Sequence, residues 1–349
     1  MRNKKGKATR RWTLSIGLIV VLFVLASGLY VTPVNAQIKL TYANFPPATT
    51  FPCIQMERWA KEVEKRTNGK VKVITFPGSS LLGPKNMFDG VRTGLADIGC
   101  LTLGYQPGRF PLSEAADLPI GMPSAKVASM VLYDLVEKYK PKEFEDIKIL
   151  TMYSCAPSNF MTRMPVRSIK DLKGAELRVV GTAADVLKLL GGTPIAMPQS
   201  DTPEALQRGV VRGVVSSLEV LKDLNYAAYC PYVTFANLQT FGFVVCMNKK
   251  KWEGLPADVK RVLDNLSRDQ ALWTGQYADD HCKEALEWSS KKYGLQVFEF
   301  SAADKAEIPK LVKPFVDGYA KRVTADGMPG DQIVKDVYRL KAKYAQEFK

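Results

Sequence analysis

The sequence predicts an α/β protein built from two lobes. One observation is the order of its segments, because strand-like and helix-like patterns alternate along most of the chain. The other is length. Removing a 36-residue N-terminal segment from the 349-residue chain leaves 313 residues, whereas single domains usually have about 100–150. Two lobes, each with its own sheet, are the expected solution.

The N-terminal segment has the layout of a secretory signal. Six basic residues and no acidic residue precede residue 12, and an apolar run of 16 residues follows at 14–29. Val34 and Ala36 then place small residues at −3 and −1 of a cleavage site. A membrane anchor is the alternative, but spanning a bilayer takes roughly 20 apolar residues. We therefore expect residues 1–36 to be a cleavable signal peptide and the rest to leave the cytoplasm.

Charge and cysteine content exclude several classes. The formal net charge of +14 falls to about +8 without the six signal charges, and the remaining basic residues alternate with acids, as at 61–66. Such alternation is typical of a solvated helix face, so no nucleic-acid partner is predicted. The six cysteines have wide, irregular spacings that do not indicate a disulfide scaffold. We expect buried, free thiols, with Cys230 and Cys246 the first pair to check for a disulfide.

The first half of the exported part alternates strands and helices. Residues 38–43 alternate in polarity as a strand does. A helix is predicted to begin near Pro52, where proline suits the first turn, and to end at Asn68 and Gly69. The further predicted elements are strands at 71–76, 96–101 and 147–153 and helices at 85–93 and 124–139. The order strand, helix, strand, helix, strand is typical of a parallel sheet.

A second α/β unit follows. Strands are predicted at 176–180, 195–197 and 210–215, and helices at 183–190 and 203–208. Residues 241–247 are almost wholly apolar, as expected for a strand covered on both faces. Helices are then predicted over 256–292 and from 304 to the end. The proposed division assigns 37–156 and about 246–287 to lobe I, and 157–245 and about 288–349 to lobe II. Ligands in such sheets bind beyond the carboxyl ends of strands.

Several segments together resemble one transport family. The sequence is similar, over essentially the whole exported part, to the solute-binding proteins of tripartite ATP-independent periplasmic (TRAP) transporters, of the DctP type. The segments that carry the resemblance are 57–71, 78–83, 94–99, 171–179, 205–213 and 252–256. The resemblance implies a periplasmic-binding-protein-like fold with a ligand cleft between lobes joined by hinge segments. It also implies a periplasmic receptor that delivers a small carboxylate to the small and large membrane subunits of a TRAP permease driven by an ion gradient.

Arg178 is the main candidate for ligand binding. It matches the arginine that clamps a ligand carboxylate in the D-x-K-G-x-x-x-R segment of the family. A guanidinium is always charged, and its planar donor fork matches a carboxylate. Some members carry a second arginine about 20 residues earlier, where this sequence has Asn159. A ligand with one clamped carboxylate is therefore favoured. A dicarboxylate stays open if Arg163 or Arg212 supplies a second charge. A metal ion that bridges the carboxylate to the protein also stays open.

Further candidates come from aligned positions and loop placement. Ser216 stands at the family's frequent asparagine and is a candidate hydrogen-bond donor. Thr102 stands at an acidic contact of sialic-acid-binding members, which argues against an amino- or polyhydroxy-sugar ligand. The remaining candidates lie on loops or strand ends expected to face the cleft: Thr50, Phe51, Tyr105, Met197 and Gln199. Of these, Phe51, Tyr105 and Met197 could form an apolar wall.

The chief alternative class is an exported hydrolase. The only histidine, His281, has no nucleophile motif that would complete a triad, and no Gly-rich phosphate loop or H-E-x-x-H motif occurs. We predict no catalytic residue, no metal ligand and no cofactor. A two-lobed receptor serving an ATP-driven transporter or a membrane sensor stays open, since fold alone does not separate these roles. The expected mechanism is an open–closed hinge in which ligand bridges both lobes and Arg178 grips it.

Overall fold

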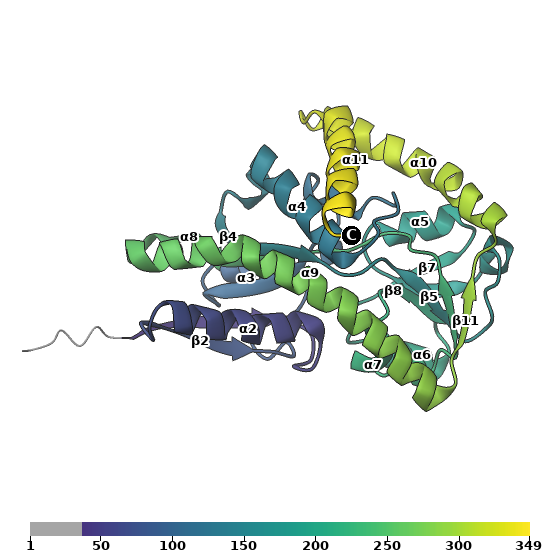
Figure 1. The fold of residues 1–349 in the computed structure, drawn as a ribbon, viewed down its shortest axis with the longest axis horizontal. Coiled ribbons are helices and arrows are strands. Elements are labelled where there is room, and N and C mark those ends of the chain that lie inside the picture. Colours follow the sequence, from purple (N-terminus) through teal and green to yellow (C-terminus); the bar gives the residue numbers. More distant parts are fainter. Residues whose placement is uncertain (1–36) are drawn as a thin grey trace, which may run out of the picture. The chain divides into compact units, whose positions relative to one another are not determined.

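The computed structural model describes residues 37–349 (Figure 1). The predicted signal peptide at 1–36 lies outside these residues. Residues 38–349 form one compact unit. It contains two β-sheets, in agreement with the predicted two-lobed α/β fold. No helix within the described part is long and apolar enough to cross a membrane.

The first sheet has five strands in the order β2-β1-β3-β10-β4. The strands are β1 (Ile38–Asn44), β2 (Val71–Phe76), β3 (Ile98–Thr102), β4 (Ile147–Ser154) and β10 (Gly242–Asn248). β1 is parallel to β2 and β3, as predicted, whereas β10 lies antiparallel between β3 and β4. β10 enters this sheet without a crossover helix from its neighbours, so it can run in the opposite direction. It is buried over most of its length, as its apolar sequence predicts.

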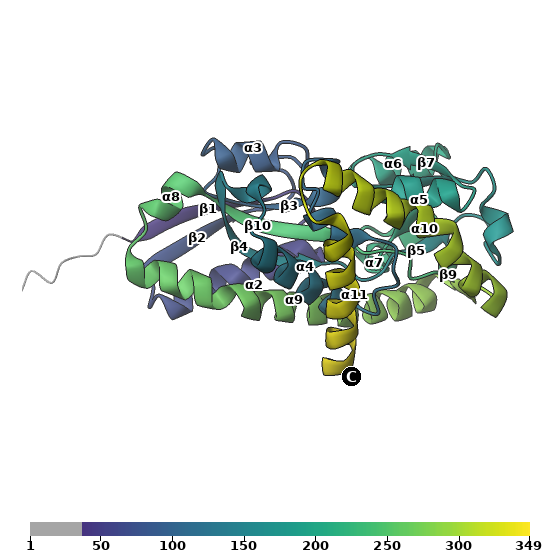
Figure 2. The ribbon, with the colours of Figure 1, turned by 90° about the horizontal axis from the view of Figure 1, so that it is seen from above.

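Helices cover this first sheet. They are α2 (Phe51–Arg66), α3 (Met87–Arg92), α4 (Ala125–Tyr139) and the short α8 (Lys249–Glu253). Pro52 lies in the first turn of α2, and the Ser124 hydroxyl caps α4 by accepting a hydrogen bond from the Val127 amide. α2 and α4 lie on one side of the sheet and α3 on the other (Figure 2).

The second sheet has six strands in the order β11-β9-β5-β8-β6-β7. They are β5 (Asn159–Thr162), β6 (Glu176–Val179), β7 (Thr193–Ala196), β8 (Gly213–Ser216), β9 (Tyr232–Phe235) and β11 (Gln296–Glu299). β6 is parallel to β7 and β8, while β5 is antiparallel to β8 and β9. The associated helices are α5 (Ala183–Leu189), α6 (Thr202–Arg208) and α7 (Val220–Asp223). Three of these strands, β5, β9 and β11, were not predicted from the sequence.

Three helices complete the chain: α9 (Ala257–Tyr293), α10 (Ala302–Ala325) and α11 (Gly330–Glu347). α9 packs against α2, α4 and β4 of the first sheet and also against α7, so one helix contacts both halves (Figure 1). α11 packs against α4. The predicted division into lobes stays a prediction. Its boundary at 246 would cut β10, which lies entirely in the first sheet, and α11 contacts the first half although it was assigned to lobe II.

All six cysteines are buried and free, which confirms the expected buried thiols. Cys230 and Cys246 form no disulfide. Cys246 lies in β10 of the first sheet, whereas Cys230 precedes β9 of the second. Burial raises the pKa of both thiols to about 12, so neither is a reactive thiolate at neutral pH.

Candidate functional site

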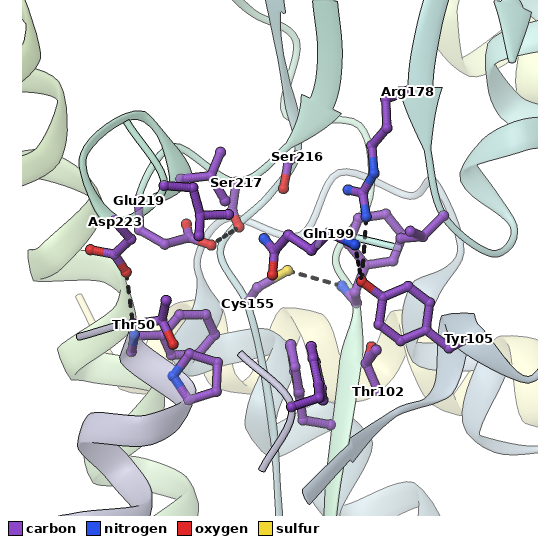
Figure 3. Close-up of a pocket in the computed structure, with 18 residues that line it drawn as sticks. Thr50, Thr102, Tyr105, Cys155, Arg178, Gln199, Ser216, Ser217, Glu219 and Asp223 are labelled. Carbon is purple, nitrogen blue, oxygen red and sulfur yellow. Dashed lines mark hydrogen bonds between the residues drawn. The ribbon is translucent and has the colours of Figure 1, made fainter. Parts of the chain in front are cut away.

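A small cavity of about 50 Å³ is lined by residues from both sheets (Figure 3). Most of its polar lining residues lie at or just after the carboxyl ends of β3, β6 and β8. Others lie in the loop before α2, in α7, and directly before α7. These strand ends are where open α/β sheets bind ligands. The two halves of the protein therefore share one site.

Arg178, the third of the four residues of β6, reaches this cavity near the carboxyl end of the strand. Backbone pairing with Ile195 of β7 and Val214 of β8 fixes the position of the residue. The side chain is 3% exposed, and its Nε donates to the Met197 carbonyl oxygen at 3.2 Å. No Asp or Glu of the described residues lies within 4.0 Å of the guanidinium. A buried cation with unused N–H groups thus faces the cavity.

Tyr105 joins this cation to the opposite half of the site. It ends the 3-10 turn Leu103–Tyr105, directly after β3. Its hydroxyl oxygen accepts a hydrogen bond from Arg178 Nη2 at 3.4 Å and from the Gln199 amide at 3.0 Å. Both lone pairs of the oxygen are then engaged. Figure 3 shows Tyr105 and Arg178 on the same side of the cavity.

Two buried carboxyl groups lie on the other side of the cavity (Figure 3). Glu219 accepts hydrogen bonds from the Ser217 hydroxyl at 2.6 Å and from Cys282 Sγ at 3.2 Å. Burial raises the pKa of Glu219, and the charge of Asp223 acts in the same direction. The lining is therefore positive at one side and carboxylic at the other.

Asp223 ties the two halves together. One of its oxygens accepts from the backbone amide of Phe51, at the first turn of α2, at 3.3 Å. The other lies 2.7 Å from His281 Nε2 on α9, and the hydrogen bond with Asp223 raises the pKa of that imidazole. Both oxygens of Asp223 are thus used within the protein. Among the described residues no group of three or more His, Cys, Asp or Glu side chains is placed to hold a metal ion.

Aromatic rings close the apolar part of the lining. Phe51 contacts Phe243 edge-to-face with ring centroids 5.7 Å apart, and Phe45 contacts Tyr105 in the same way at 5.5 Å. Val180 and Phe241 add further apolar surface. A ligand here would meet rings between the two polar sides, a pattern usual for small-molecule pockets.

Seven predicted residues line the cavity. They are Thr50, Phe51, Thr102, Tyr105, Arg178, Gln199 and Ser216. The hydroxyls of Thr50 and Thr102 donate to backbone carbonyl oxygens, of Pro47 at 2.8 Å and of Gly242 at 3.2 Å. The hydroxyl of Ser216 forms no hydrogen bond within the described residues, although this residue is only 7% exposed.

The structure does not place the other three predicted residues at the cavity. The Asn159 oxygen accepts from the amides of Ala236 and Asn237, at 2.9 and 3.0 Å, so its side chain holds a loop. Met197 contributes its carbonyl oxygen to Arg178 and not an apolar wall. Arg212 is exposed and does not line the cavity, because it precedes β8 at the amino end of that strand, whereas the cavity lies at the carboxyl end.

Sequence analysis missed Ser217, Glu219 and Asp223. A signal was present: these residues directly follow the strand predicted at 210–215, and ligands bind beyond the carboxyl ends of such strands. In this segment, alignment with the family pointed only to Ser216 as a ligand-binding candidate. The two carboxylates lie only three and seven residues further on.

The family model for bacterial extracellular solute-binding proteins, family 7 (DctP), matches residues 42–322. The chain belongs to this family. The match confirms the resemblance drawn from the sequence segments, and the solved structures similar to this solute-binding protein are TRAP periplasmic solute-binding proteins.

Three of these structures are informative. A protein from Desulfovibrio salexigens is 52% identical, with a TM-score of 0.81 over 88% of this chain and 97% of that one; it is an open complex with the C-terminus of a symmetry mate in its ligand-binding site. A marine metagenome protein specific for aromatic acids, solved with 3-hydroxybenzoate, is 30% identical, with a TM-score of 0.84 over 88% and 99%. A Bordetella bronchiseptica protein with bound mandelate is 28% identical, with a TM-score of 0.82 over 88% and 99%.

Proposed function

We propose that this protein is the periplasmic receptor of a TRAP transporter, that it binds a small organic monocarboxylate, and that it performs no catalysis. Arg178 holds the ligand carboxylate in this proposal. The observation that carries it is the buried guanidinium, which faces the cavity with no carboxylate of the described residues within 4.0 Å.

Physical chemistry favours an anion beside Arg178. A buried charge is costly unless it is paired and hydrogen-bonded. A carboxylate can accept two parallel hydrogen bonds from a guanidinium, and such charge-assisted bonds are among the strongest in proteins. The ligand would therefore supply the counter-charge that the protein lacks at this point.

The relatives support the same ligand class. The 3-hydroxybenzoate and mandelate bound by two of them are small carboxylates with an aromatic ring. A peptide C-terminus, which occupies the site of the 52% identical protein, is also a carboxylate. The ring-lined middle of the present cavity, with Phe51 and Phe243, suits an aromatic or similarly flat acid.

A monocarboxylate is favoured over a dicarboxylate. Arg178 is the only basic residue of the described chain that lines the cavity. Arg163 and Arg212, the two alternatives for a second grip, are exposed, and Arg163 donates to the Leu206 carbonyl oxygen. A second ligand carboxylate would lie toward Glu219, and like charges at short range repel.

The lining also favours a receptor over a hydrolase. Cys155 lines the cavity, but burial raises the pKa of its thiol. His281, the only histidine of the sequence, is paired with Asp223 and is not a lining residue. Ser217 donates to Glu219, but the other oxygen of Glu219 accepts from Cys282. No histidine base therefore lies beside a lining nucleophile among the described residues.

Thermal unfolding tests the binding proposal. Residues 37–349 would be screened against a library of small organic acids, with Arg178→Ala alongside. A ligand at 100 times its dissociation constant stabilises the protein by about 2.7 kcal/mol, which raises Tm by roughly 5–10 °C. We expect a group of monocarboxylates to give this shift and Arg178→Ala to abolish it.

Arg212→Ala is the matched control, because it removes an exposed arginine that directly precedes β8, the strand beside β6. It should leave the shift unchanged. A shift that survives in Arg178→Ala, or no shift from any acid, would contradict the proposal.

Delivery to a permease needs its own experiment. The alternative is a receptor for an ATP-driven transporter or a membrane sensor. Genes for a small and a large membrane subunit should adjoin this gene, and those subunits in vesicles should take up the identified acid only with this receptor and an ion gradient. Uptake that requires ATP instead would support the alternative.

A further inference from the structure

The ligand cavity is chemically polarised. In Figure 3, Arg178 and Tyr105 lie on one side, the carboxyl group of Glu219 lies on the other, and Ser216 lies between them. A simple hydrophobic acid would use only the first side. The Glu219 carboxyl group on the second side would then be a buried hydrogen-bond acceptor that faces apolar ligand atoms, which is unfavourable.

Glu219 is the group that gives the second side its chemistry. It is 5% exposed, and within the described residues it has no basic partner within 4.0 Å. Its oxygens accept one hydrogen bond each, from Ser217 and from Cys282. A carboxylate has about four lone-pair sites, so two acceptor positions remain.

Asp223 does not compete for this role. Like Glu219, it has one hydrogen-bond contact at each oxygen, but one of its partners is His281, a base 2.7 Å away that can supply a counter-charge. These contacts connect α7 with α2 and α9, so Asp223 acts within the protein. Glu219 has no such basic partner among the described residues and is therefore the better acceptor for a ligand group.

Ser216 is an independent observation that points the same way. Its side chain is more than nine-tenths buried and lines the cavity. Its hydroxyl forms no hydrogen bond with the described residues and is not among the fully buried atoms that lack a partner, so it is open to the cavity and free to bind. A polar ligand atom near the middle of the cavity would satisfy it.

We propose that the ligand carries a second polar group, a hydroxyl or an amide N–H, at the end away from its carboxylate, and that this group donates a hydrogen bond to Glu219. Ser216 contacts the ligand between the two ends. The natural substrates are then hydroxylated or amide-bearing monocarboxylates. This inference rests on the proposed carboxylate binding at Arg178.

Pairs of acids that differ only in hydroxyl against methyl test the inference. The three hydroxybenzoates would be compared with the three methylbenzoates by calorimetry, using wild type, Glu219→Gln, Glu219→Leu and the exposed control Glu204→Gln. We expect at least one hydroxy acid to bind wild type roughly tenfold more tightly than its methyl partner. Both Glu219 variants should reduce that ratio to about threefold or less without weakening the binding of unsubstituted benzoate, while Glu204→Gln should change neither.

The outcomes separate this inference from the proposed function. If acids bind in an Arg178-dependent way but no hydroxy acid is preferred, or the preference survives both Glu219 variants, the inference is wrong and the receptor proposal stands. If none of the acids binds, both are wrong for this ligand class. Melting temperatures of the unliganded variants show whether Glu219→Leu is folded, and Glu219→Gln, which conserves shape, decides the question if it is not.

Discussion

Tyr105 shows how one hydroxyl can serve both recognition and closure. Its oxygen accepts from Arg178 and from the Gln199 amide, and no acceptor for its own proton occurs in the described part of the chain. A hydroxyl with both lone pairs engaged can still donate. We expect this proton to go to the ligand carboxylate, next to the guanidinium.

Tyr105→Phe should therefore weaken acid binding and leave the fold intact. Hydrogen bonds to charged groups contribute about 1.5–3 kcal/mol, so the dissociation constant should rise roughly tenfold or more. Calorimetry with the acid identified by thermal screening gives the measurement. Tyr226→Phe is the control, because that hydroxyl donates to the Gln199 carbonyl oxygen at 3.3 Å without lining the cavity. If the two variants lose the same affinity for the acid, Tyr105 contributes only by positioning Gln199 and does not contact the ligand.

At the scale of elements, a buried carboxylate helps to hold α11 on α4. Asp336 accepts hydrogen bonds from Lys138 and from Tyr139 (2.6 Å) on α4, and from Arg339 in its own helix. Burial alone would raise the pKa of Asp336, but these partners hold it at about 2. A carboxylate whose pKa is lowered on folding stabilises the protein above its unfolded pKa, and this stabilisation is lost as pH falls through the folded value.

Asp336→Asn should destabilise the protein by about 1–2 kcal/mol at pH 7, since the partners are themselves largely exposed and screened. The difference from wild type should shrink between about pH 4 and pH 2, as the wild-type carboxylate becomes protonated. Urea unfolding at several pH values measures it. The exposed Asp331→Asn, in the first turn of α11, should cost less, at most about the 0.3–1 kcal/mol that a carboxylate contributes at a helix N-terminus. A deficit that stays constant down to pH 2 would contradict the role of the charge.

At the scale of the whole molecule, the two halves meet backbone to backbone beside the ligand cavity. Gly104 lies in the turn that bears Tyr105, and Gly181 follows β6, which bears Arg178. A Cβ added at Gly181 would lie 2.9 Å from Gly104 Cα, closer than real contacts allow. Gly181 also has a φ of +51°, which glycine adopts at little cost. The described conformation is thus one in which the halves are in contact, whereas the 52% identical relative is an open complex.

Gly181→Ala should hinder closure. We expect the dissociation constant of the identified acid to rise at least roughly tenfold, because binding energy would be spent on relieving the clash. Solution scattering should show wild type becoming more compact at saturating ligand and the variant less so. If wild type does not compact, the hinge mechanism is wrong.

Gly104→Ala provides the matched control. Its added Cβ would lie no closer than 3.6 Å to any neighbour, an ordinary contact, so binding should change little. The positive φ at Gly181 costs an alanine roughly 1–2 kcal/mol in the open form too. The melting temperature of the unliganded variant measures this backbone cost. Only an additional loss of ligand affinity can then be assigned to hindered closure.

Long, periodic elements were predicted more closely than short ones. β2 was predicted to the residue, and α9 within one residue at each end, because local spacing of apolar side chains defines such elements. β5, β9 and β11 have four residues each and were not predicted. β6, β7 and β8 are equally short, but they alternate with α5 and α6 in a strand–helix order that the sequence shows. The strand character of β5, β9 and β11 comes from hydrogen bonds to partners far along the chain, such as those pairing Asn159 with Ser216.

The sequence by itself determined the family, the α/β fold class and the candidate status of Arg178, because a motif with its spacing carries that information locally. Only the tertiary structure decided which polar groups are free to meet a ligand. Asn159 is engaged by amides almost 80 residues away, whereas Ser216 has no partner in the described residues and Glu219 keeps spare acceptor positions. Whether a buried polar group is satisfied depends on neighbours brought together by folding, and no local pattern records them.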